Sequence, residues 1–297
     1  MTDLKMRFFS TLHPAVSLCY FIGMLGLTLA CVHPVAVFLS LMGAAWFLFL
    51  LRGAKALGKT MRFVGPMFLF VALANPLFNH RGVTMLFLLF DQWITLEAIS
   101  YGLVSAGLLA AIIMWFACYQ EVMTSDKFLY LFGQIAPSAS LLITMTLRFI
   151  PQLQRNAGEI KEARRMLSGE PARLTQKLEA AMRELSALLG MSMEQAVETA
   201  DSMKARGYGM KRRTTFHLFR FDSRDAGMLA AVLALAGVCA LARVFGHGYM
   251  DFYPRMTAVL HGAPSYTQFV LFGLLAALPG ILEGREAIRW RCFGLMN

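Results

Sequence analysis

The chain has few charged residues for its length. Only 15% of its 297 residues are Asp, Glu, Lys or Arg, whereas 57% are hydrophobic. Soluble domains carry about 25% charged residues, so this composition argues against a soluble protein and for a membrane protein. Apolar runs of roughly 17 to 25 residues, long enough to cross a bilayer, recur along the chain. We therefore expect an all-α, polytopic membrane protein.

The sequence also lacks the residue patterns of metal sites and of common catalytic sites. Its five cysteines show no C-x-x-C spacing, and most fall in apolar runs, where cysteine behaves as a small hydrophobic residue. The six histidines lie apart, with no H-E-x-x-H pair, and no G-x-S-x-G elbow occurs. The sequence therefore predicts no disulfide, no metal, no cofactor and no catalytic cluster.

One motif resembles a nucleotide site. Residues 53–60 (GAKALGKT) match the phosphate-binding pattern G-x-x-x-x-G-K-[ST]. Residues 86–91 (LFLLFD) are similar to the second motif of such sites, an apolar strand that ends in an acidic residue. A phosphate-binding loop needs a strand before it and a helix after it within a parallel sheet. Here the motif follows an apolar run of membrane-spanning length. We expect a flexible cytoplasmic loop that binds no nucleotide.

The cations suggest how the spans are oriented. About six spans are expected, near residues 14–32, 34–51, 63–78, 98–119, 226–245 and 266–282. Residues 52–62 hold four cations and no anion, and the positive-inside rule places such a loop in the cytoplasm. The N-terminus, with Lys5 and Arg7, then lies on the same side, and three arginines in residues 285–291 place the C-terminus there too. The cation-poor residues 79–97 would lie outside.

The fourth span carries a ladder of small residues. They are spaced by four, at Ala98, Gly102, Ala106 and Ala110. In lipid, helices associate through close packing, which small residues permit. We expect this face to contact protein rather than lipid.

Residues 120–150 allow two interpretations. The apolar segment at 128–132 is short, and the one at 136–150 contains Pro137 and is followed by Pro151. The two segments form either interfacial or half-spanning helices or a tilted pair of spans. Either arrangement leaves the following region in the cytoplasm.

That region is polar and lies between apolar blocks. Fourteen of the 28 Lys and Arg residues fall between residues 155 and 224, among nine Asp and Glu. Mixed charge on helical segments indicates a surface for another protein rather than a basic arm for nucleic acid. Three helices are predicted, one ending near Leu167 and two at about 173–189 and 193–206. Ser192-x-x-Gln195 is a capping-box pattern that would start the third.

The second and third predicted helices each carry an apolar face. The second has a seam of residues at steps of three and four: Leu174, Leu178, Ala181, Leu185 and Leu188. Such a seam must pack on something. The face of the third is built from Met193, Ala196, Val197, Ala200 and Met203. Small and flexible side chains of this kind adapt to a partner.

Two similar triplets lie near the ends of the predicted helices. They are Ala163-Arg164-Arg165, shortly before Gly169, and Ala205-Arg206-Gly207. A cation in the last turn of a helix can simply complement the helix dipole and cap free carbonyls. Two such arginines on one polar insert of a membrane protein favour a second explanation, in which both are presented to a partner.

With its surroundings, this pair resembles the transmembrane T component of energy-coupling factor (ECF) transporters, whose coupling helices each end in an Ala-Arg-Gly-like triplet. Further blocks follow the family's order from about residue 60 to 210: Asn75-Pro76-Leu77-Phe78, a loop with Gly82, Ile94-Thr95-Leu96-Glu97-Ala98 with Tyr101-Gly102, and Leu147-Arg148-Phe149-Ile150-Pro151. The chain departs from the family at Arg165, which stands where glycine is expected.

The resemblance implies a fold, partners and site residues. Residues 1–135 and 214–297 would be transmembrane, and residues 136–213 would be the cytoplasmic coupling-helix region. The chain would be a non-catalytic subunit in a bacterial inner membrane. It would join two cytoplasmic ABC-type ATPases to a substrate-binding S component for uptake of a vitamin or a transition-metal ion. Arg164 and Arg206 would be the anchors on the ATPases, with Arg165 contributing less.

A secondary transporter with its own substrate site is the alternative from another class. It would need paired ionisable residues at mid-membrane and broken helices in repeat-related positions. Apart from Asn75-Pro76, the predicted spans contain neither. An integral membrane enzyme would need a catalytic cluster, which the sequence also lacks.

Overall fold

The computed structural model describes residues 8–79, 82–89, 92–169, 173–210, 219, 221–246, 250–252 and 262–294. The chain forms two compact units. We call residues 1–128 with 219–297 the bundle, and residues 129–218 the insert. The cationic cluster at residues 211–213 lies outside the described residues.

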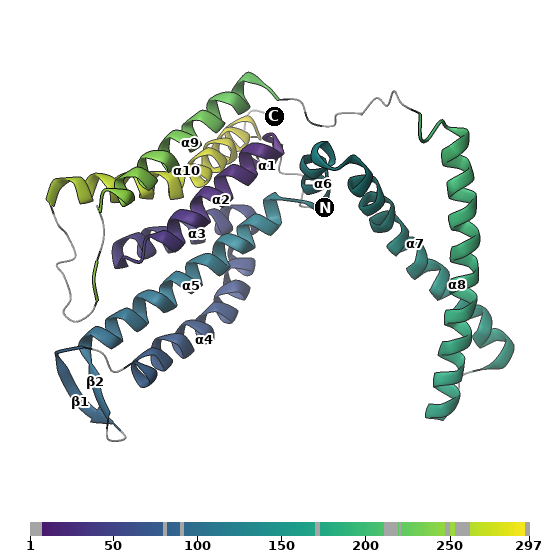
Figure 1. Cartoon of the computed structure of the whole chain (residues 1–297), viewed down its shortest axis with the longest axis horizontal. Coiled ribbons are helices and arrows are strands. Elements are labelled where there is room, and N and C mark those ends of the chain that lie inside the picture. Colours follow the sequence, from purple (N-terminus) through teal and green to yellow (C-terminus); the bar gives the residue numbers. More distant parts are fainter. Residues whose placement is uncertain are drawn as a thin grey trace. The chain divides into compact units, whose positions relative to one another are not determined.

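The helices of both units are shown in Figure 1. The bundle contains α1 (Phe8–Thr11), α2 (Pro14–Ala30), α3 (Pro34–Arg52), α4 (Ala54–Phe78), α5 (Leu96–Val122), α9 (Ser223–Val244) and α10 (Gly262–Gly294). The insert contains α7 (Pro137–Ser168) and α8 (Leu174–Ala205), and α6 (Ser125–Ile135) begins in the bundle and ends in the insert.

Five of these helices are long and apolar enough to cross a membrane. They are α3, α4, α5, α9 and the part of α10 from Tyr266 to Arg285. A shorter apolar helix, α2, occupies the first predicted span. The prediction of an all-α polytopic membrane protein is therefore confirmed. The small exception is a hairpin of β1 (Met85–Leu89) and β2 (Gln92–Thr95), which lies in the predicted outer loop.

The loop predicted at residues 52–62 is wrong, because α4 begins at Ala54. Lysine, arginine, alanine and leucine are good helix formers, so this cationic stretch continues the helix instead of interrupting it. Only Gly53, with a φ of 79°, separates α3 from α4. A left-handed backbone at this point suits glycine, which has no Cβ to clash.

α4 is not broken at Asn75-Pro76, the one position where the sequence allowed an interrupted span. Pro66 and Pro76 both lie inside α4, which ends at Phe78. Proline removes a backbone N–H, and membrane helices tolerate this where neighbouring helices and polar side chains compensate. Next to Pro76, Asn75 Nδ2 donates to Ser105 Oγ of α5 at 3.1 Å. This bond joins α4 to its packing partner at the proline.

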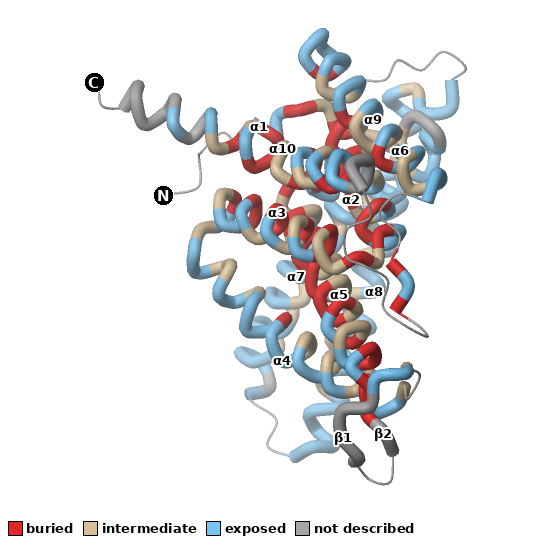
Figure 2. Tube along the Cα trace, turned by 90° about the vertical axis from the view of Figure 1, so that its left-hand side faces the viewer, coloured by how far each residue is buried: buried red, intermediate tan, exposed pale blue. Residues whose placement is uncertain are grey.

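The ladder of small residues on α5 is confirmed as a packing face. All four of its members are buried. A Cβ added at Gly102 would lie 3.1 Å from the carbonyl oxygen of Ala72 on α4. In Figure 2 buried residues run along α5, whereas most of α4 is not buried. At Gly102 the ladder therefore lets the backbone of α4 come close to α5.

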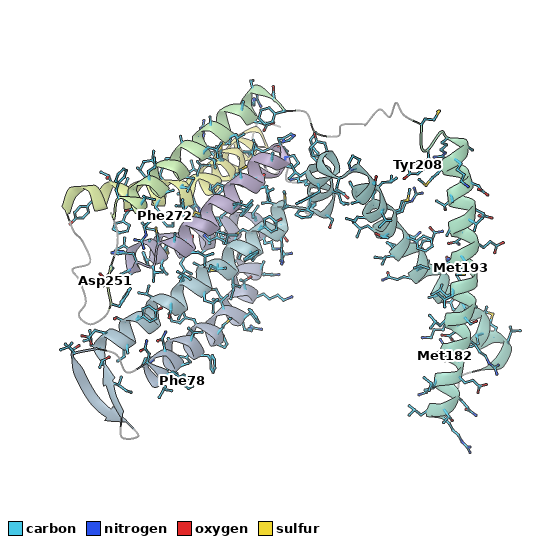
Figure 3. All side chains as sticks on the ribbon, viewed as in Figure 1. Phe78, Met182, Met193, Tyr208, Asp251 and Phe272 are labelled. Carbon is cyan, nitrogen blue, oxygen red and sulfur yellow. The ribbon has the colours of Figure 1, made fainter. Side chains whose placement is uncertain are left out.

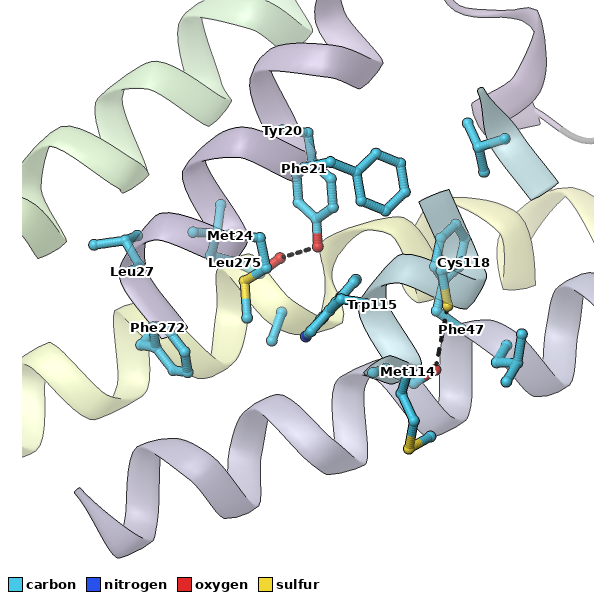
Figure 4. Packing of buried hydrophobic residues seen from close by; sticks show 14 of the residues in the cluster. Tyr20, Phe21, Met24, Leu27, Phe47, Met114, Trp115, Cys118, Phe272 and Leu275 are labelled. Atoms are coloured by element: carbon cyan, nitrogen blue, oxygen red, sulfur yellow. Dashed lines mark hydrogen bonds between the residues drawn. The ribbon is translucent and has the colours of Figure 1, made fainter. Parts of the chain in front are cut away.

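The core of the bundle is aromatic and centres on Trp115 of α5 (Figure 4). Its fully buried members include Tyr20, Phe21, Met24, Phe47, Met114, Phe272 and Leu275. Trp115 Nε1 donates to Ser40 Oγ at 2.9 Å, and Tyr20 OH donates to the Leu275 carbonyl at 3.1 Å. The polar atoms of these large side chains are therefore satisfied inside the bundle, across α2, α3, α5 and α10.

Between residues 120 and 150 the structure favours the first of the two interpretations. Pro137 is the first residue of α7, where a missing N–H costs nothing, and Pro151 lies inside that helix. α6 has 11 residues and is about 16 Å long, well short of the roughly 30 Å of a bilayer core. Neither α6 nor α7 is among the spanning candidates. Length and composition thus favour interfacial or half-spanning helices over a tilted pair of spans.

The two helices predicted at 173–189 and 193–206 are one helix, α8. Ser192 does not cap a helix start, because its Oγ donates to the Leu189 carbonyl within the helix at 2.9 Å. Gly190 is also helical, and an internal glycine costs only about 1 kcal/mol relative to alanine. The capping-box pattern at Ser192 was thus a false signal.

Candidate functional site

The insert is an antiparallel pair of long helices. Two side-chain pairs show the register: Gln152 with Gln195, and Arg164 with Glu184. As the chain advances along α7, its partner on α8 moves backward. The end of α7 therefore lies beside the beginning of α8, and the end of α8 lies far from it, where Figure 3 labels Tyr208.

The two triplets consequently lie at opposite ends of the insert. The first is level with Glu184 on α8, and Arg206 follows Glu184 by 22 residues at the end of the same helix. A helical rise of 1.5 Å per residue separates the two positions by about 33 Å. We call residues 163–169 the first tip and residues 203–209 the second tip. They are two contact points, too far apart for a single small ligand.

The second tip has the geometry that its glycine predicts. Gly207 has a φ of 82°, its N–H donates to the Lys204 carbonyl at 2.9 Å, and Tyr208 N–H donates to the Met203 carbonyl at 3.0 Å. This is a Schellman motif. A Cβ at Gly207 would lie 2.5 Å from Met210 Cε. Arg206 directly precedes the turn and is exposed.

The first tip is built differently. Ala163, Arg164 and Arg165 are all inside α7, which continues to Ser168. The residue with positive φ is Gly169, at 69°, and its N–H donates to the Arg165 carbonyl at 3.0 Å. Because Arg165 has helical dihedrals, no glycine is required at its position. With arginine instead of glycine at position 165, the left-handed turn that ends the helix is still present, but it lies four residues later, at Gly169.

The two arginines named as anchors have different surroundings. Arg164 Nε donates to Glu184 Oε1 at 2.5 Å and Nη1 to the Gly169 carbonyl at 3.4 Å, and its side chain is only 20% exposed. Arg165, beside it, is exposed, as is Arg206. Arg164 thus joins the end of α7 to α8. Sequence reasoning missed Glu184, because nothing in the sequence sets the register of the two helices.

A groove of about 420 Å³ lies between α7 and α8 at the first tip. It is lined by Lys161, Arg164, Arg165, Lys177, Ala180, Ala181 and Glu184. The lining holds four cations and one carboxylate, which is the one paired with Arg164. The groove is therefore strongly cationic.

The apolar seam of α8 is uncovered. Along α8, described from Leu174 to Ala205, no residue is buried. In the seam Leu174 is 84% and Leu178 68% exposed, and in the face further along α8 Met193 is 73% and Val197 62% exposed. Met182 and Met193 project from the helix in Figure 3. Exposed apolar surface of this kind marks a site of interaction with protein or membrane. The sequence predicted that the seam would pack against another surface, and within the insert it does not.

The nucleotide-like motif has no phosphate-binding setting. Residues 54–60 form the first turns of α4, and β1 belongs to an antiparallel hairpin rather than a parallel sheet. Asp91 lies outside the described residues. The loop that would wrap around a phosphate is missing, because only Gly53 of the motif lies outside a helix. Among the described residues, no group of three or more His, Cys, Asp or Glu could hold a metal ion.

We expect the purified chain to show no ATP binding, and Lys59→Ala to change nothing. Titration with a fluorescent ATP analogue measures this directly. Arg62→Ala, on the same cationic turns of α4, is the matched control for binding through charge alone. Saturable binding that is lost in Lys59→Ala and kept in Arg62→Ala would overturn the expectation.

The site therefore consists of two arginine-bearing tips about 33 Å apart, a cationic groove at the first tip, and an uncovered apolar seam along the helix that joins the tips. A scan of the chain against known protein families found no match, and neither did a search of curated proteins. The insert's own geometry and the resemblance in its motifs thus carry the functional argument.

Proposed function

We propose that the chain is the transmembrane T component of an ECF-type ABC importer in a bacterial inner membrane. In this role it joins two cytoplasmic ATPases to a membrane subunit that binds the substrate, a vitamin or a transition-metal ion. The chain itself is not an enzyme. The observation that carries the proposal is the pair of Ala-Arg-x triplets at opposite ends of one two-helix insert.

The separation of the tips supports two protein partners. Subunits that each bind one tip need contact points far enough apart for both to fit, and about 33 Å provides this. An exposed guanidinium such as that of Arg206 can form a bidentate pair with an acidic side chain in a partner's groove. Movement of the two ATPases during hydrolysis would then act on both ends of a stiff helix pair.

The exposed apolar surface supports a further membrane partner. The seam of α8 and the outer face of α4, where Phe70 is 72% and Phe78 is 85% exposed, lie uncovered. In the proposed role, these surfaces hold the substrate-binding subunit. Flexible methionines on α8 suit a contact that must reform in each transport cycle.

The alternative, a secondary transporter, finds less support. Three buried carboxylates among the described residues of the bundle, Glu97, Asp225 and Glu283, are used in structural bonds, and Asp225 accepts from the His13 N–H at 3.2 Å. Glu97 accepts from Thr84 Oγ1 at 2.6 Å, and Glu283 accepts from Phe9 N–H at 3.1 Å. A transporter's coupling residues would instead face one another at mid-membrane.

The test is co-expression of the full chain with a pair of ABC-type ATPases and a small membrane protein, followed by purification through a tag on the chain. We expect one stable complex containing all four chains. Recovery of the chain alone, with substrate uptake in proteoliposomes that needs no ATP, would favour the secondary transporter.

The proposal also fixes the topology. Both termini and the insert are expected on the cytoplasmic side, from the cations at residues 52–62, 155–224 and 285–291. Single cysteines at Ser138, Glu194 and Asn297, in a variant whose native cysteines are replaced by alanine, should be labelled by an impermeant maleimide only after the cells are opened. Labelling of position 194 in intact cells would refute this topology.

A further inference from the structure

The first turns of α4 carry three cations that no contact within the chain uses. Lys55, Lys59 and Arg62 are all exposed, and residues 52–62 contain no acidic residue. None of the three forms an ion pair with another residue that the structure describes, whereas Arg52, just before α4, is paired with Glu121 of α5. These three side chains are therefore available to an anion from outside the chain.

The three cations share one face of α4 with exposed apolar residues further along the helix. Successive residues of an α-helix are turned by about 100°, so every member of this face lies within about 40° of a line through Lys55. Leu69 and Leu73 are 59% and 58% exposed. We call this face the α4 stripe, and its members, all exposed, are Lys55, Lys59, Arg62, Pro66, Leu69 and Leu73.

The length of the apolar part of α4 sets the depth of the cations in a bilayer. α4 is long and apolar enough to cross a membrane. From Phe63 to its end at Phe78 it is about 24 Å long, whereas the hydrocarbon core is about 30 Å thick. Lysine and arginine at the end of a short apolar segment extend their side chains toward the lipid head groups. Arg62 and Lys59 are thus placed at the level of the lipid phosphates, and Leu69 and Leu73 among the acyl chains.

We propose that the α4 stripe binds an anionic phospholipid, with Lys55, Lys59 and Arg62 on its head group and Leu69 and Leu73 along an acyl chain. Clusters of cations at the ends of membrane spans recognise anionic head groups in this way. A soluble phosphate would gain nothing from the apolar half of the stripe. The site requires only that α4 crosses the bilayer, so it goes beyond the proposed transport role and does not depend on it.

The lipid site gives a role to residues that resemble a nucleotide-binding motif. Lys55 and Lys59 belong to the pattern at residues 53–60, which in a phosphate-binding loop surrounds the phosphate with backbone N–H groups. Here all of the motif after Gly53 is helical. The phosphate contacts therefore come from side chains on successive turns of a helix, a geometry that suits a head group lying along α4.

The surface proposed for the substrate-binding subunit lies on a neighbouring side of α4. Phe70 and Phe78 are turned from Lys55 by about 60° and 140°. A lipid on the α4 stripe and a protein on these aromatic side chains can therefore lie next to each other without sharing contact residues.

The first experiment titrates the purified full chain in detergent with phosphatidylglycerol or phosphatidylcholine and counts bound lipids by native mass spectrometry. We expect phosphatidylglycerol to bind more tightly. The triple variant Lys55→Gln, Lys59→Gln, Arg62→Gln should lower its affinity at least tenfold, since each cation beside an anionic lipid contributes roughly fivefold.

A matched triple variant controls for net charge. Arg148→Gln, Arg224→Gln, Arg285→Gln removes the same charge from exposed arginines of α7, α9 and α10 and should leave the affinity unchanged. Equal losses in the two triple variants would show attraction to overall charge and overturn the site. Equal binding of the two lipids to the unaltered chain would overturn it as well, and so would displacement of the lipid by an equal concentration of glycerol 3-phosphate, which would indicate a site for soluble phosphates.

The second experiment leaves the cations in place, so its result does not depend on how well the triple variant folds. The photoreactive residue p-benzoylphenylalanine replaces Leu69 in one variant and Leu241 of α9 in another, because both leucines are 59% exposed. Each variant is irradiated in phosphatidylcholine vesicles that contain a minority of phosphatidylglycerol, and the captured lipids are identified by mass spectrometry. We expect the share of phosphatidylglycerol to be severalfold higher at position 69. Equal shares at the two positions would show that α4 selects no anionic lipid, and the proposal would be wrong.

Discussion

Replacement of Arg206 by alanine is expected to abolish stable association with the ATPases and, with it, transport. The side chain is exposed in the chain alone and follows the last residue of α8, directly before the Schellman turn. When an arginine buried in a partner's groove is truncated, the partner's acidic group stays buried and unpaired, a loss of about 2–5 kcal/mol. Measured as the dissociation constant of the ATPases, this is roughly 30-fold to several thousand-fold.

If Arg206 only complements the helix dipole, its replacement should have a smaller effect, and that effect should be on the stability of the chain rather than on its association with the ATPases. A cation that only complements the helix dipole contributes about 0.3–1 kcal/mol, and its loss lowers the stability of the chain rather than its association. Arg183→Ala is the matched control, since Arg183 is an exposed arginine of the same helix, paired with Glu179. If Arg206→Ala and Arg183→Ala bind the ATPases equally well, the coupling role of the second tip is wrong.

A conservative replacement sharpens the result. Arg206→Lys keeps the charge but loses the planar fork that pairs with a carboxylate in two bonds. We expect it to recover only part of the affinity. Full recovery would show that charge alone attracts the partner, which fits a loosely held tip and not an inserted anchor.

The spans were predictable because their signal is long and redundant. Each of the six predicted spans coincides with an apolar helix, and the ladder of small residues on α5 is buried as expected. In lipid, every backbone group must be bonded within the segment, so a long apolar run leaves few alternatives to a helix. Composition and length therefore carry most of the information.

Helix boundaries were less predictable because the breaking signals are weak compared with tertiary context. Pro76, Pro151 and Ser192 all lie inside helices, although each was interpreted as an end, an interruption or a start, and Gly190, which lay between two predicted helices, is helical too. A single proline or glycine costs a few kcal/mol at most, and long helices absorb this. The positive φ at Gly169 and Gly207, by contrast, marks true ends.

The pairing within the insert could not be read from the sequence at all. Whether Arg164 or Arg165 faces α8 depends on the rotation and register of two helices, and one step along a helix turns a side chain by 100°. Both residues carry the same side chain, so composition cannot distinguish them. Only Glu184, 20 residues further along, selects Arg164.

Replacement of Trp115 by alanine is expected to give the largest loss of stability in the bundle. The side chain is fully buried among Tyr20, Phe21 and Phe47, and its Nε1 is bonded to Ser40. Tryptophan-to-alanine changes in cores cost about 3–5 kcal/mol through lost contacts and the cavity left behind. In a membrane the transfer from water contributes little, so we expect the lower end, about 3 kcal/mol, and a lower midpoint of thermal unfolding in detergent.

Two variants separate the sources of that loss. Phe116→Ala, one residue further along α5 with a side chain that is 48% exposed, removes an aromatic ring from the surface and should cost well under half as much. Trp115→Phe keeps an aromatic ring but removes the N–H and part of the indole, so we expect about 1 kcal/mol for the lost hydrogen bond and a smaller cavity cost than for alanine. Ser40 Oγ retains its contact with Thr28 Oγ1 at 3.2 Å in that variant. Equal losses in Trp115→Ala and Phe116→Ala would show that α5 packs elsewhere, and that the aromatic centre does not hold the bundle together.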